Sequence, residues 1–141
     1  MINIFYEEIE ILDYRPEFFV SWLSKVCESE GKSLGELSLI FTSDEYLLNM
    51  NKQHLDHDYY TDIITFDYTE GDTVSGDLFI SIDRVNDNAS SLNVSRETEL
   101  NRVVVHGTLH LIGFGDKSEV EAKLMRDKEN YYLTQIVSRE T

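Results

Sequence analysis

Four segments of the chain have the composition of β-strands. They are short, apolar and rich in β-branched and aromatic residues, as expected of strands that pack on a core. They cover residues 2–6, 36–42, 62–68 and 77–82. The run TEGDTVSG lies between the last two and consists largely of turn-forming residues, so residues 62–82 are compatible with a β-hairpin.

Residues 15–30 have the apolar spacing of an amphipathic helix. Pro16 near the start and Gly31 just past the end are typical helix boundary residues. The apolar positions recur every three or four residues, at Phe18, Phe19, Trp22, Leu23 and Val26. This aromatic stripe is interpreted as core rather than as a ligand-binding surface.

The later part of the chain is predicted to be helical. Thr42 and Glu45 have the spacing of a capping box, which predicts a short helix after residue 42. After residue 82 the remainder is helical, and Ser95 is expected to cap a helix that runs to about Leu111. Gly113 and Gly115 end this helix. Ser118 and Glu121 form a second capping box, which opens a helix through about Val137.

Strands early and helices late predict an α+β (mixed α/β) fold. We expect one small mixed sheet of about four strands packed with helices. The length of 141 residues predicts a single domain, residues 1–141, with a buried core. No repeat or low-complexity segment divides the chain.

The net charge of −15 argues against broad, nonspecific binding to nucleic acid, and DNA is not an expected partner. The charge is uneven, however. Residues 1–94 carry a net charge of −14 and residues 95–141 only −1. A phosphate-bearing substrate could therefore approach the C-terminal part at a lower electrostatic cost, although the acidic excess also serves solubility.

The chain is expected to work in the cytoplasm. No apolar run approaches the roughly 18–20 residues of a membrane span, and the acidic start MINIFYEEIE does not resemble a signal peptide. Cys27 is the single cysteine, which fits a reducing compartment. We interpret it as a small apolar residue in a helix.

The segment VVVHGTLHLIGFGD, residues 103–116, carries the candidate chemistry. His106 and His110 are four residues apart, so on a helix they project from one face and can bind one metal ion. Gly113 ends the helix, and the chain can then bring Asp116 to the same ion. Three nitrogen and oxygen ligands leave a fourth position free, which is the pattern of catalytic zinc, although other divalent metals suit the same donors. An open zinc site lowers the pKa of bound water to about 7.

The alternative to a metal site is a pair of buried, hydrogen-bonded histidines on a core helix. The spacing H-x-x-x-H-x-x-G-x-x-D favours the metal, because it is the spacing of the metzincin zinc motif with Asp as third ligand. Zinc peptidases place a general base, Glu, directly after the first His. Gly107 occupies that position here, which argues against a peptidase.

The segment HGTLHLIGFGDK resembles the signature of the YbeY family of bacterial endoribonucleases and rRNA maturation factors. TDIITFDY at residues 61–68 and SGDLFIS at residues 75–81 are similar to two strands of that family, and Met125 and Glu129 fit its trailing M-x-x-x-E helix. The resemblance implies a zinc-dependent, single-strand-specific endoribonuclease. It further implies maturation of the 3′ end of 16S rRNA, contact with the small ribosomal subunit and a role in ribosome quality control.

Two positions depart from the family pattern. Asp116 replaces the usual third His, which makes the site less positive. Leu55 stands where many family members carry Arg. We assign His57 as a candidate proton donor or phosphate contact, since imidazole can do either, while an ordinary loop histidine is an equal alternative.

Further polar residues have weaker assignments. Asp62 and Asp77 lie at predicted strand starts, where they could orient a histidine or cap a turn. Lys117 and Arg126 could contact phosphate or be solvated. Two other functions remain open: a ribosome-assembly factor with a structural metal and little nuclease activity, and a zinc metallopeptidase.

Overall fold

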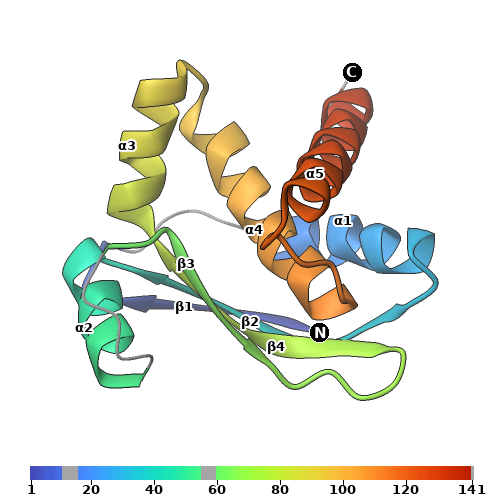
Figure 1. Cartoon of the computed structure of the whole chain (residues 1–141), viewed down its shortest axis with the longest axis horizontal. Helices are drawn as coiled ribbons and strands as arrows, with labels where there is room; N and C mark the ends of the chain where they lie inside the picture. Colours follow the sequence, from blue (N-terminus) through green and yellow to red (C-terminus); the bar gives the residue numbers. More distant parts are fainter. Residues whose placement is uncertain (11–15, 55–59, 141) are drawn as a thin grey trace.

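The computed structural model describes residues 1–10, 16–54 and 60–140, and helices cover a mixed sheet in it (Figure 1). The strands are β1 (Ile2–Glu7), β2 (Ser33–Thr42), β3 (Ile63–Asp67) and β4 (Thr73–Ser81). Their spatial order is β1-β2-β4-β3, with β1 and β4 parallel to β2 and β3 antiparallel to β4. The four-stranded mixed sheet, the β3–β4 hairpin and the α+β class therefore confirm the predictions.

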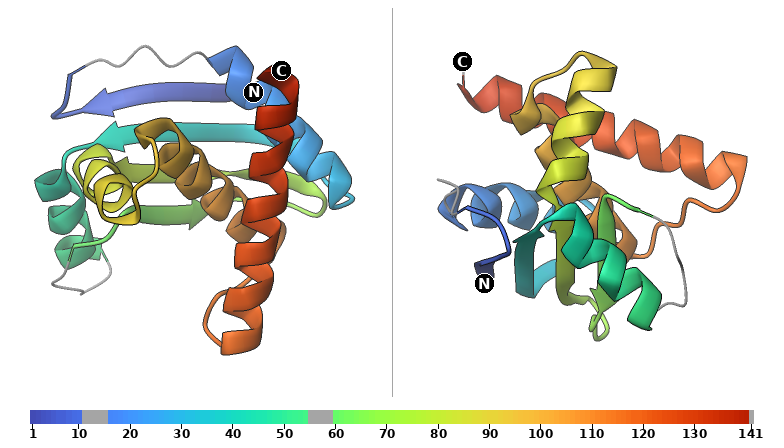
Figure 2. Two further views of the ribbon diagram at one scale, coloured as in Figure 1. Left: turned by 90° about the horizontal axis from the view of Figure 1, so that it is seen from above. Right: turned by 90° about the vertical axis from the view of Figure 1, so that its left-hand side faces the viewer.

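The helices are α1 (Pro16–Ser29), α2 (Asp44–His54), α3 (Ile82–Leu92), α4 (Arg96–Ile112) and α5 (Glu119–Glu140). α1 connects the parallel strands β1 and β2, and α4 lies over the sheet between α3 and α5. α2 and α5 lie at opposite ends of the molecule in two views (Figures 1 and 2). Among the described residues, no helix has both the length and the hydropathy that a bilayer span requires.

α4 packs on the sheet through its most apolar segment. Val103, Val104 and Val105 are buried, as the triple valine predicts. At Gly107 an added Cβ would lie 2.7 Å from Ile63 Cδ1 and 2.9 Å from Leu78 Cδ2. A side chain at this position would displace the ends of these two side chains, so glycine lets helix and sheet approach closely without that shift.

Several local predictions need correction at element boundaries. Ile82 is the first residue of α3 rather than the end of a strand, because the Ser81 side chain accepts a hydrogen bond from Arg84 N and caps the helix. Ser43, not Thr42, caps α2, since its Oγ accepts from Tyr46 N. The Thr42 hydroxyl instead donates to backbone oxygens.

Other local predictions are confirmed. Ser95 caps α4 by accepting from Thr98 N. Cys27 is fully buried in the core, and burial, with the nearby Glu28 carboxylate, raises the pKa of its thiol to about 11. It is therefore an apolar filler, as interpreted from the sequence.

Polar contacts hold the middle of α5 against α1 and the residue that follows α1. The Tyr132 hydroxyl donates to Glu30 Oε2, Lys128 Nζ lies 2.9 Å from the same oxygen, and Trp22 Nε1 donates to Tyr132 O at 3.2 Å. Burial by itself raises the pKa of the Glu30 carboxyl, but the hydrogen bonds from Tyr132 and Lys128 outweigh it and lower that pKa. The contact is thus strongest when Glu30 is ionised.

We predict that Tyr132→Phe lowers the free energy of unfolding by about 1–2 kcal/mol at neutral pH, through loss of a hydrogen bond to a charged group. Because the native state depresses the pKa of Glu30, the contribution is present above its ordinary value of 4.5 and is lost as the pH falls through the depressed value. The deficit of the variant should shrink in acid. Urea unfolding across pH measures it, with Tyr131→Phe at the exposed neighbouring ring as control. Equal deficits in both variants would contradict the prediction.

Candidate metal centre

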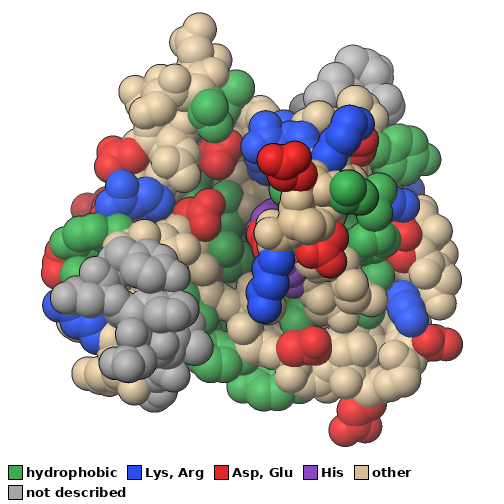
Figure 3. Space-filling view, in the orientation of Figure 1, with side chains coloured by type: hydrophobic (Ala, Val, Ile, Leu, Met, Phe, Trp, Pro, Cys, Tyr) green, Lys and Arg blue, Asp and Glu red, His purple; other side chains and the backbone are tan. Residues whose placement is uncertain are grey.

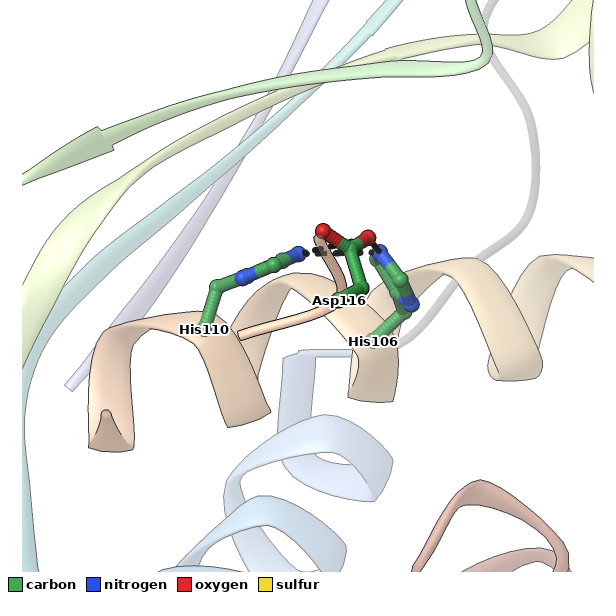
Figure 4. Close-up of side chains that lie close together, drawn as sticks. All are labelled: His106, His110 and Asp116. Atoms are coloured by element: carbon green, nitrogen blue, oxygen red, sulfur yellow. Dashed lines mark hydrogen bonds and ion pairs between the residues drawn. The ribbon is translucent and has the colours of Figure 1, made fainter. Parts of the chain in front are cut away.

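Three side chains meet at the C-terminal half of α4 (Figure 4). His106 and His110 project from one face of the helix, and Asp116 returns to them from the following loop. His106 Nε2 lies 3.1 Å from His110 Nε2, and Asp116 Oδ2 lies 3.4 Å and 3.3 Å from these two atoms. The structure therefore brings together the three residues that the sequence singles out as metal ligands.

These distances fit coordination of a shared ion. Ligands at about 2.0–2.1 Å from a tetrahedral metal are separated by about 3.3 Å, close to all three measured values. Within the described ranges, His106, His110 and Asp116 are the full set of His, Cys, Asp and Glu side chains found to meet in this way. The donor set fits a divalent metal such as zinc, and the described residues contribute no ligand at the fourth coordination position.

Local sequence explains how Asp116 reaches the histidines. Gly113 has φ of 128°, and its N–H contacts the carbonyls of Leu109 and His110, which ends α4 and reverses the chain. Beyond the aspartate, Ser118 and Glu121 exchange hydrogen bonds as a capping box, which confirms that prediction. The loop that carries Asp116 is thus held at both ends.

A buried carboxylate orients the first histidine. Glu129 Oε2 lies 2.6 Å from His106 Nδ1, and Arg102 donates to the other Glu129 oxygen at 3.0 Å. When Nδ1 donates to Glu129, the lone pair of Nε2 faces His110 and Asp116. This carboxylate–histidine pair is the arrangement that commonly supports a metal ligand.

The site concentrates negative charge. Burial disfavours the charged imidazole of His106, but the hydrogen bond to Glu129 and the charges of Glu129, Asp116 and Asp62 raise its pKa overall. Burial tends to raise the pKa of Glu129, yet its bonds to His106 and Arg102 lower it. Burial raises the pKa of Asp62. Such a cluster favours a bound cation.

Two hollows meet at the three side chains. A cavity of about 540 Å³ lies between α3, α4 and α5, and another of about 470 Å³ lies on the β3 side. Asp62, His106 and Asp116 line both. Figure 3 shows histidine at the bottom of a central hollow, with Lys and Arg side chains near it. The centre is accessible from two directions.

The other predicted residues have different outcomes. Asp62 lies beside the centre, where its carboxyl accepts from the backbone of Ile63, so the turn-capping interpretation fits. Asp77 lies inside β4, not at its start, and lines a cavity on the other sheet face with Phe79. Side chains alternate along a strand, so the Asp77 side chain lies on the opposite face of the sheet from that of its neighbour Leu78.

Two basic candidates also differ in position. Arg126 is exposed and lines the larger cavity, whereas Lys117 is an exposed neighbour of Asp116 in sequence. Leu55 and His57 lie outside the described residues, so the assignment of His57 stays a prediction.

Sequence reasoning missed three roles. The sequence indicates Glu129 only as part of a family motif and gives no role to Arg102 or Glu99. All three residues line the larger cavity. The usable signal was the position of Glu99 and Arg102 on the same helix as His106, seven and four residues earlier, which places them on the same side.

We predict that Glu129→Gln weakens binding of a divalent metal by about 10- to 100-fold, the usual effect of losing a carboxylate behind a ligating histidine. Competition with a chromogenic chelator measures the affinity. Asp127→Asn, which removes an exposed carboxylate two residues away on α5, is the control and should bind as wild type. Unchanged affinity in Glu129→Gln would show that Glu129 does not support a ligand.

A second prediction concerns the turn after α4. Gly113→Ala and Gly71→Ala both place a side chain at positive φ with nothing within 4 Å of the new Cβ. Each should cost about 1–2 kcal/mol of stability. Only Gly113→Ala should also weaken metal binding, because Gly71 lies in the β3–β4 turn. Equal metal affinity in the two variants would show that the turn at Gly113 does not position Asp116 for metal binding.

Comparisons with known proteins show the family of the chain. The family model described as "Endoribonuclease YbeY" matches residues 4–137. The chain is 52% identical over 130 residues to a protein of that name from Flavobacterium johnsoniae, covering 92% of this chain and 93% of that one. It is 47% identical over 140 residues to another from Porphyromonas gingivalis, with 99% and 91% covered.

A solved structure shares the fold. The solution structure of TM1509 from Thermotoga maritima superposes with a TM-score of 0.72 at 27% sequence identity, and the match covers 99% of this chain and 91% of that one. The family match spans nearly the whole chain, including β2, β3, β4, most of β1 and the three clustered side chains. This chain therefore belongs to the endoribonuclease YbeY family.

Proposed function

We propose that this chain is a zinc-dependent endoribonuclease that cleaves single-stranded RNA at the centre formed by His106, His110 and Asp116. We further propose that it matures the 3′ end of 16S rRNA on the small ribosomal subunit, takes part in ribosome quality control and acts in the cytoplasm. Family membership supports the enzyme class predicted from the sequence, a hydrolytic endoribonuclease. The metal, the single-strand preference and the ribosomal role are proposals that go beyond family membership.

The convergence of three ligand atoms at tetrahedral spacing carries this proposal. Separations of 3.1–3.4 Å between two imidazole nitrogens and a carboxylate oxygen are those of ligands around one small cation. A bound divalent metal supplies Lewis-acid charge to a phosphate oxygen and lowers the pKa of water.

The protein side chains supply orientation. Glu129 fixes the ring of His106, and Arg102 fixes Glu129 in turn, with a second contact of 2.8 Å to Asn130 Oδ1. Preorganised groups of this kind need little rearrangement during the reaction, which is the main source of catalytic electrostatics.

The surroundings suit a single strand. The two cavities meet at His106 and Asp116, so an extended chain can lie across the centre with one nucleotide in each. Arg102 and Arg126 line the larger cavity and provide positive charge for phosphate in an otherwise acidic protein. We retain His57 as the proposed proton donor or phosphate contact.

Two rival functions are separable from this one. A metallopeptidase needs a general base after the first histidine, and Gly107 supplies no side chain there. A Cβ at this position would also displace the side-chain ends of Ile63 and Leu78. A ribosome-assembly factor with a structural metal predicts binding to small subunits without cleavage. Asp116 in place of a third histidine is the observation that keeps this rival open.

We predict that the purified chain cleaves single-stranded RNA and spares duplex of the same sequence. Chelator, His110→Ala and Asp116→Ala should each lower the cleavage rate by at least about 100-fold, because removing the Lewis acid removes several kcal/mol of transition-state stabilisation. Elemental analysis should find about one zinc per chain in wild type and much less in both variants.

Asp72→Ala is the matched control, because this carboxylate is 77% exposed and lies in the β3–β4 turn. It should cleave as wild type. Equal cleavage by wild type, chelated protein and His110→Ala would discard the proposal. Co-sedimentation with small subunits in the absence of cleavage would favour the assembly factor, and casein digestion would favour the peptidase.

A further inference from the structure

The larger cavity has a polar floor and apolar walls. Leu92, Val94 and Met125 contribute apolar surface from α3, the following turn and α5. Leu92 and Val94 are 61% and 42% exposed, so their side chains present apolar surface to the cavity. A volume of about 540 Å³ lies within the range of small-ligand sites.

Glu99 is the anomalous residue of this cavity. It is only 5% exposed, it lines the cavity, and its Oε1 has no hydrogen-bond partner among the described residues. A buried, unpaired carboxyl oxygen destabilises a fold, so its presence calls for a partner that the described residues do not provide.

The electrostatic surroundings define what that partner must offer. Burial raises the pKa of the Glu99 carboxyl; Asp62 and Glu129 add to this effect, and Arg102 and Arg126 oppose it. A ligand that donates hydrogen bonds to Glu99 relieves the burial, whereas a ligand that presents only acceptors is repelled.

We propose that the larger cavity is a nucleobase subsite next to the cleavage centre, in which Glu99 accepts hydrogen bonds from the N–H groups of a base, with guanine preferred. The proposal rests on the proposed RNA substrate and adds its base preference. Leu92, Val94 and Met125 pack against the base, while Arg102 and Arg126 face its phosphate.

Guanine fits because of its donor pattern. Its N1–H and N2–H₂ are adjacent donors that match the two oxygens of one carboxylate. Adenine and cytosine offer one amino group beside an acceptor nitrogen. Uracil presents a single N–H between two carbonyl oxygens, which a carboxylate repels. The expected order of affinity is guanine first and uracil last.

Binding of nucleoside monophosphates to the full-length, metal-loaded chain tests the proposal without any need for cleavage. Calorimetric titration of wild type should show 5′-GMP binding about 10- to 100-fold more tightly than 5′-UMP, the range of one bidentate carboxylate–base contact. Glu99→Gln should remove most of this preference by weakening GMP binding and strengthening UMP binding, because one carboxylate oxygen is replaced by a donor that suits the carbonyl oxygens of uracil. Glu97→Gln, an exposed carboxylate on the same helix, should keep the preference.

Thermal unfolding distinguishes recognition from a structural role. Glu99→Gln should not lower the unfolding midpoint, since Oε1 has no partner to lose. Equal affinity of wild type for all four nucleotides would overturn the subsite even if the chain cleaves RNA. A lower midpoint with a parallel loss of affinity for all nucleotides would also overturn it. GMP preference that depends on Glu99 in a chain without nuclease activity would support the subsite and overturn only the cleavage function.

Discussion

The close contact between α4 and the sheet at Gly107 is the constraint on which the candidate centre depends. A Cβ at this position would displace the side-chain ends of Ile63 and Leu78, so glycine lets the helix lie this close to the sheet without that shift. Gly107 faces the sheet, while His106 and His110 lie together on one face of the helix, one turn apart. Position 107 is packed against the sheet and carries no general base beside the first histidine.

The parts of the centre that the sequence predicted are those specified within a few residues. Helical spacing relates His106 to His110, and Gly113 reverses the chain by its own φ. Glu129 lies 23 residues from His106, and their contact exists only because α5 packs across α4. The unpaired oxygen of Glu99 is likewise a property of tertiary burial. At the strand–helix boundary, Ile82 has the composition of a strand residue, but Ser81 accepts a hydrogen bond from Arg84 N and α3 begins at Ile82.

Charge explains why an acidic protein can act on a polyanion. Arg102 and Arg126 lie in the cavity itself, while much of the net charge of −15 lies in residues 1–94. Exposed charges farther than about 8 Å from a phosphate are largely screened at physiological ionic strength, so local cations outweigh the distant acidic surface. Arg102 is only partly available, since Glu129 and Asn130 hold its guanidinium. Arg126 is the more accessible of the two for a backbone phosphate.

The carboxylate at the third ligand position affects the charge available for substrate binding. A carboxylate at Asp116 contributes a negative charge where an imidazole would be neutral, so a bound divalent cation retains less positive charge for the substrate. Positive charge must then come from the protein, and Arg102 and Arg126 stand at the cavity that opens onto Asp116. Exchanging Asp116 for histidine would increase the charge of a metal-loaded centre by one unit without lengthening the loop between Gly113 and Ser118. The aspartate therefore makes substrate binding depend more on these arginines than an all-histidine centre would.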